Sequence, residues 1–155
     1  MNCMAFLKSH RMLIILLIFT LCFIWGNSLL SASVSGAFSG RVNDLVNMIW
    51  HTLDHKMVSS GDGVLRKVAH ATEFAALGME TLALFQYDFK KNWTSIFLCG
   101  VSTALIDETI QLFTAGRSGQ IRDIWIDFTG FLLGVLLIHI TLGRKQKKKD
   151  QSSKK

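Results

Sequence analysis

Long apolar windows constrain this chain more than any other feature of its sequence. Four windows have about the length that a helix needs to cross a bilayer core, and the chain contains no proline to interrupt them. They are Met12 to Leu30, Val68 to Phe85, Trp93 to Phe113 and Ile124 to Leu142. Because 50% of the residues are hydrophobic, an ordinary soluble domain is excluded. The sequence predicts an all-α integral membrane protein, a four-helix bundle that forms one transmembrane domain over residues 1–143.

The first window has two interpretations. Its run "MLIILLIFTLCFIW" follows Lys8 and Arg11, as in a signal peptide, and "SAS" at 31–33 resembles a loose cleavage site. We favour a span that is not cleaved, because the other three windows need a fourth helix to close a bundle.

The basic residues predict an orientation. Eleven of the 17 Lys and Arg residues belong to the N-terminus, the loop between the second and third windows, and the tail "RKQKKKDQSSKK" at 144–155. By the positive-inside rule, these segments lie in the cytoplasm, and so do both termini. The tail is expected to be disordered and to lie beside anionic lipid, so we expect no nucleic-acid partner.

The segment between the first two windows faces outward in this orientation. Its stretch "RVNDLVNMIWHTL" at 41–53 carries apolar residues at helical spacing. This pattern predicts an extracytoplasmic amphipathic helix on the outer interface or over the mouth of the bundle.

Ionisable and amide side chains in the last three windows gather at one depth. Each lies where its window begins or ends on the outer side, so the topology alone brings them to one level. An intramembrane carboxylate costs at least about 2.5 kcal/mol on insertion scales, so several together should face a cavity or one another. The groups are His70 and Glu73, then Asp107, Glu108 and Gln111, then Asp123 and Asp127, with Arg117 in the turn between.

Small residues continue the polar face of the fourth window. Asp123 and Asp127 are four residues apart, and Gly130 and Gly134 follow on the same helical face. Since small residues permit close helix approach, we expect this face to look into the bundle. In a purely structural interpretation, Arg117 or Arg122 would pair with one of the aspartates.

Three segments carry polar residues in a specific order: "RKVAHATEFAALG", "ALIDETIQLFTAGR" and "RDIWIDFTGFLLG". The residues concerned are Lys67, His70 and Glu73; Asp107, Glu108, Gln111, Gly116 and Arg117; and Asp123, Asp127, Gly130 and Gly134. This order resembles the signature of the VanZ-like family of small bacterial membrane proteins. The resemblance covers nearly the whole chain except the basic tail, and Asp127 stands where many members have Asn.

The resemblance implies a location and a function. The family is named for a member associated with resistance to the glycopeptide antibiotic teicoplanin. Its polar outer residues have been proposed to act on lipid head groups or lipid-linked cell-wall intermediates. We therefore expect a protein of the bacterial cell membrane whose partners are membrane lipids or lipid-linked precursors.

For an enzyme, the polar residues divide into two groups. His70 would be the general base or nucleophile, and a neighbouring carboxylate would orient it or act as an acid in transfer or hydrolysis at a lipid phosphate or ester. The catalytic candidates are His70, Glu73, Asp107, Glu108 and Gln111. The substrate-binding candidates are Arg117 as the anion ligand, Asp123, Asp127 and Lys67.

The same residues allow three other interpretations. A divalent metal held by His70, Asp107, Glu108 and Asp123 is not favoured, because neither these residues nor the three cysteines show a metal-specific spacing. A non-catalytic protein that binds lipid, precursor or antibiotic, with the cluster as a structural network, is the main alternative. Transport is disfavoured, because the inner halves of the windows are nearly all apolar.

Overall fold

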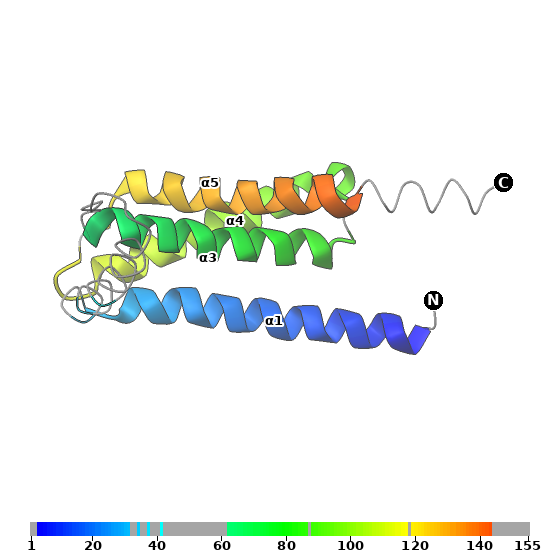
Figure 1. Cartoon of the computed structure of the whole chain (residues 1–155), viewed down its shortest axis with the longest axis horizontal. Coiled ribbons are helices and arrows are strands. Elements are labelled where there is room, and N and C mark those ends of the chain that lie inside the picture. Colours follow the sequence, from blue (N-terminus) through cyan, green and yellow to red (C-terminus); the bar gives the residue numbers. More distant parts are fainter. Residues whose placement is uncertain are drawn as a thin grey trace, which may run out of the picture.

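Four long helices form the part of the chain that the computed structural model describes, residues 3–31, 34, 37, 41, 62–86, 88–117 and 119–143 (Figure 1). They are α1 (Cys3–Leu29), α3 (Asp62–Leu84), α4 (Phe89–Leu112) and α5 (Ile121–Ile138), which continues into a π-helical turn, η1 (His139–Gly143). These residues contain no strand, in agreement with the predicted all-α class. The predicted amphipathic helix, apart from Arg41, and the basic tail lie outside the described residues.

Three of these helices contain segments long and apolar enough to cross a membrane: His10–Leu29, Phe89–Leu112 and Ile121–Thr141. Among the described residues, α3 does not meet this criterion, although the sequence analysis predicted a span there. Arg66, Lys67 and Glu73 are among the ionisable residues that lower its hydropathy. Part of this polar surface contacts other helices, since Lys67 pairs with Asp123 and Glu73 accepts a hydrogen bond from Asn27.

The most extensive contact joins α3 to α5. A Cβ atom on Gly134 would overlap the carbonyl of Ala75, and one on Gly130 would overlap the carbonyl of Ala71. Only glycine permits this approach, which brings the two backbones together. Asp127, Gly130 and Gly134 are all buried, so the prediction that this face looks into the bundle is confirmed.

An apolar core fills the bundle behind the polar residues. All four long helices contribute buried side chains to it, and the largest are Ile24, Phe74, Leu77, Leu82, Ile96 and Phe131. The end of α1, the start of α3, the end of α4 and the start of α5 lie together at one end of the bundle (Figure 1). The core thus supports the end at which the predicted site residues lie.

Candidate functional site

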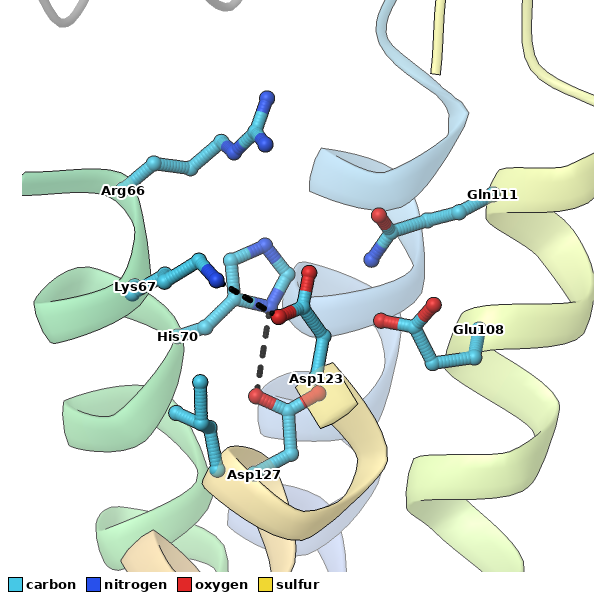
Figure 2. A pocket seen from close by; sticks show the side chains of 8 residues that line it. Arg66, Lys67, His70, Glu108, Gln111, Asp123 and Asp127 are labelled. Carbon is cyan, nitrogen blue, oxygen red and sulfur yellow. Dashed lines mark hydrogen bonds and ion pairs between the residues drawn. The ribbon is translucent and has the colours of Figure 1, made fainter. Parts of the chain in front are cut away.

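A small cleft opens at this end of the bundle, between α3, α4 and α5 (Figure 2). Its cavity volume of about 10 Å³ gives room for about one water molecule. Six of the nine predicted site residues line the cleft, together with two that the sequence analysis did not name, Arg66 and Ile126. The six are Lys67, His70, Glu108, Gln111, Asp123 and Asp127.

His70 faces two buried aspartates. Its Nδ1 atom lies 3.7 Å from Asp107 Oδ2 and 3.9 Å from Asp127 Oδ1, distances too long for hydrogen bonds. Asp107 is 0% exposed and Asp127 is 2% exposed. The Oδ2 atom of Asp127 is buried and has no hydrogen-bond partner among the described residues. Potential ligand atoms of the three residues lie within 4.8 Å of one another, so this group could hold a metal ion.

The end of α1 completes the site, and the sequence analysis did not predict this. Ser28 Oγ donates a hydrogen bond to Asp107 Oδ1 at 2.6 Å, and Gln111 Nε2 donates to Asp107 Oδ2 at 2.9 Å. Asn27 Nδ2 donates to Glu73 Oε1 at 3.0 Å. The signal was present in the sequence, since the adjacent Asn27 and Ser28 end the first apolar window at the same level as the predicted cluster.

The turn between α4 and α5 is tied to both α1 and α4. Gly116 has a φ of 74°, in the left-handed region that favours glycine. The next residue, Arg117, donates from Nη2 to the carbonyl of Asn27 at 3.0 Å. Glu108 Oε2 accepts a hydrogen bond from the backbone N–H of Gln120 at 2.8 Å, at the start of α5. Two of the predicted site residues therefore also hold the turn in place.

Arg117 lies apart from the cleft lining. Its Nε and Nη1 atoms are buried without a hydrogen-bond partner among the described residues. Burial lowers the pKa of its guanidinium from the ordinary value, yet an arginine stays charged at neutral pH. Two buried nitrogens of this cation thus have no acceptor in this part of the chain.

Lys67 forms the ion pair at the edge of the cleft. Its Nζ atom lies 2.9 Å from Asp123 Oδ1, and the two side chains are 29% and 19% exposed. The structural interpretation of the sequence assigned such a pair to Arg117 or Arg122. Among the described residues neither arginine forms such a pair, and Lys67 reaches Asp123 from the neighbouring helix α3.

An apolar groove of about 450 Å³ lies beside the cleft, between α1 and α3. Glu73 lines this groove instead of the cleft, and its Oε2 atom is buried without a hydrogen-bond partner among the described residues. Since His70 and Glu73 are one turn apart, α3 contributes to both spaces. The groove is lined by Phe19, Thr20, Phe23, Ala69, Thr72, Glu73 and Ala76.

These features define a helical protein that has three candidate membrane spans among its described residues and a buried polar site at one end of its bundle. The model of the VanZ/LLP1 family matches residues 13–142, so the chain belongs to this family. The resemblance found in the three sequence segments is thereby confirmed. Comparisons with curated proteins and with solved structures gave no significant match.

Proposed function

We propose that this protein is an enzyme of the bacterial cell membrane that acts on lipid head groups or lipid-linked cell-envelope intermediates. One observation carries the proposal: a polar cleft and an apolar groove lie next to each other on α3. An amphiphilic substrate needs both, because its head group requires polar partners and its acyl chain requires an apolar surface. Phe19 and Phe23 of the groove are more than half exposed, where a lipid chain has access to them.

In this proposal α3 crosses the membrane as a fourth span. The side chains of Lys67, Glu73 and Glu80 contact other helices, which lowers the cost of placing them in a bilayer. Both termini lie in the cytoplasm, and the cleft opens on the outer side. The start of α1 and the end of α5 support this arrangement, because they lie together at the end of the bundle opposite the cleft (Figure 1).

The proposed reaction is transfer or hydrolysis at a lipid phosphate or ester. His70 takes the proton from the water or hydroxyl as this nucleophile bonds to phosphorus or carbon, and returns it to the alcohol oxygen that leaves when the old bond breaks; the nearby carboxylates of Asp107 and Asp127 stabilise the intervening imidazolium. Because the cavity itself has room for about one water molecule, the phosphate lies at its opening, where Arg66 and Lys67 bind it as cationic donors. Arg117, with two nitrogens that lack partners among the described residues, is a further anion ligand.

Lipid turnover by the purified protein tests this proposal. The protein would be placed in nanodiscs with a bacterial lipid extract, and products would be measured by mass spectrometry. His70→Ala should lower turnover at least about 100-fold, as expected for loss of a general base. His139→Ala is the matched control, because His139 packs against Phe89, outside the cleft and groove linings, with ring centroids 5.9 Å apart. Equal turnover by wild type and His70→Ala, or no turnover by either, would contradict the proposal.

A non-catalytic protein that binds lipid-linked precursors or antibiotic is the second candidate. It is favoured by the hydrogen bonds among Ser28, Asp107 and Gln111, which suit a structural network. His70→Ala and Glu108→Ala, made separately, distinguish the two. If both variants accumulate in the membrane but an envelope or teicoplanin-susceptibility phenotype disappears, the structural network fails as an explanation. If neither variant accumulates, the catalytic proposal loses its support.

A further inference from the structure

We infer that His70, Asp107 and Asp127 bind a divalent metal ion. The first support is the distance between the candidate ligand atoms. Two ligand atoms that bind one ion at about 2.1 Å each can be at most about 4.2 Å apart. His70 Nδ1 lies 3.7 Å and 3.9 Å from one oxygen of each aspartate, inside this limit. Ligand atoms of all three residues lie within 4.8 Å of one another, so a side-chain shift of less than about 1 Å brings all three onto one ion.

The second support is that neither buried aspartate is paired with a Lys or Arg side chain in the described part of the chain. Among the described residues, no Lys or Arg nitrogen lies within 4.0 Å of either Asp107 or Asp127. The Oδ2 atom of Asp127 has no hydrogen-bond partner in this part of the chain, and the residue is 2% exposed. Buried carboxylates are normally paired with cations or coordinate metals. A divalent ion between the two aspartates would supply the missing positive charge.

The third support is the environment of the proposed ligands. Ser28 and Gln111 each donate a hydrogen bond to Asp107, as outer partners that orient a metal-binding carboxylate do. The cleft beside His70 and Asp127 has room for about one water molecule, which suits the open position of a catalytic metal site. Figure 2 shows His70 and Asp127 facing each other across this space.

The ligands that the structure indicates differ from the set considered in the sequence analysis, which included Glu108 and Asp123 but not Asp127. Glu108 accepts a hydrogen bond from the Gln120 backbone, and Asp123 pairs with Lys67. Asp127, which has neither kind of partner among the described residues, takes their place. One imidazole and two carboxylates suit Mn²⁺ or Zn²⁺, and the absence of a thiolate from the set argues against softer ions.

The role of the ion rests on the proposed function, but its binding does not. With the ion bound, His70 Nδ1 would be a ligand and no longer the general base, and the ion would take over that role by activating a water molecule or polarising a phosphate oxygen. Arg66 and Lys67 would then contact the remaining phosphate oxygens from the cleft lining.

Metal binding by the full-length protein in detergent tests the inference. Any histidine tag would be removed and the protein stripped with a chelator. Mn²⁺ and Zn²⁺ binding would then be measured by calorimetry and elemental analysis. We expect one ion per chain and an affinity at least about 100-fold lower in Asp127→Asn, since loss of even an outer partner costs up to this factor. Glu80→Gln is the matched control, because Glu80 lies on α3 but bonds to Thr20. Absence of binding, or equal binding by Asp127→Asn, would overturn the inference.

Thermal unfolding shows whether a variant that does not bind metal is still folded. In chelator, Asp127→Asn should unfold at about the same temperature as wild type, because asparagine has nearly the size and shape of aspartate. Added metal should stabilise wild type and Glu80→Gln but not Asp127→Asn. If Asp127→Asn does not accumulate, His70→Gln takes its place in both measurements.

The outcomes separate this inference from the proposed function. Specific binding of an ion by a protein that never alters lipid would support the metal site and contradict the proposed enzyme. Lipid turnover by a protein that binds no ion would support the enzyme and overturn the metal site.

Discussion

The helix α3 packs against α5 and against α1 in two different ways. Against α5 the backbones touch, because Gly130 and Gly134 leave no side chain between the helices. Against α1 the contact includes side-chain hydrogen bonds, Asn27 to Glu73 and Thr20 to Glu80, with an apolar groove alongside. The α3–α5 contact therefore fixes the spacing of the site residues, and the looser α1 contact leaves room for a ligand.

The largest effect is expected at the α3–α5 contact. Gly134→Leu places a side chain where even a Cβ atom overlaps the Ala75 carbonyl, so the helices must separate. We expect a loss of about 3 kcal/mol or more in the free energy of unfolding and little protein in the membrane. Size-exclusion chromatography and unfolding in detergent measure both. Gly26→Leu is the control, because nothing lies within 4 Å of a Cβ atom on Gly26. Similar losses from the two substitutions would contradict the special role of this contact.

A smaller loss is expected where α1 joins the site. Ser28→Ala removes the hydrogen bond to Asp107 and leaves a buried carboxylate oxygen with one donor fewer. The expected cost is about 1–3 kcal/mol, measured by unfolding in detergent. Thr109→Ala is the control, because the exposed Thr109 hydroxyl donates a hydrogen bond within its own helix, to the carbonyl of Leu105. If Thr109→Ala costs as much as Ser28→Ala, the attachment of α1 through Ser28 is not supported.

The ion pair at the edge of the cleft should matter more for activity than for stability. Because Lys67 and Asp123 are both partly exposed, Lys67→Met should cost about 1 kcal/mol or less in unfolding free energy. Lipid turnover should fall further, since the proposed phosphate contact is lost. Asp123→Asn and the double substitution complete a thermodynamic cycle for the pair. A stability loss well above this range would make Lys67 a structural residue.

The smallest effect on stability is expected in the groove. Ala69 is exposed and lines the groove, so Ala69→Trp should change the free energy of unfolding by no more than about 0.5 kcal/mol. The bulky ring should nevertheless slow turnover of long-chain lipids while sparing a short-chain analogue. Val68→Trp is the matched control, because the neighbouring Val68 is also exposed but does not line the groove. Equal effects on both chain lengths would remove the groove from the proposed binding site.

Much of the fold could be predicted from the distribution of apolar residues. The windows at Trp93 and Ile124 correspond to α4 and α5, whose observed starts lie four and three residues earlier, at Phe89 and Ile121. Helix ends are hard to predict because they depend on caps, such as the Asp88 side chain that accepts from the Lys91 backbone. Whether the window at Val68 spans a membrane was harder to predict, because ionisable residues lower the hydropathy of α3. Contacts with other helices, which the sequence does not show, shield these residues.

The depth of the candidate site residues could be predicted from the sequence, but not which of these residues contact each other. His70, Asp107 and Asp127 lie at one end of the bundle, as the topology required. Nothing in the spacing indicated that Asp127 would face His70 while Asp123 pairs with Lys67, because that choice depends on how α5 is rotated against α3. The hydrogen bonds from Asn27 and Ser28 of α1 to the site were not predicted either, because an isolated pair of polar residues at the end of a span shows no helical periodicity.

The sequence by itself determined that the chain is helical, where its apolar windows lie and at which end its polar residues gather. Those properties follow from composition and from the order of residues along each helix. Only the tertiary structure decided which carboxylates face His70 and which are used as structural contacts. The physical reason is the close approach at Gly130 and Gly134, which sets the rotation of α5 and so directs Asp127 into the cleft.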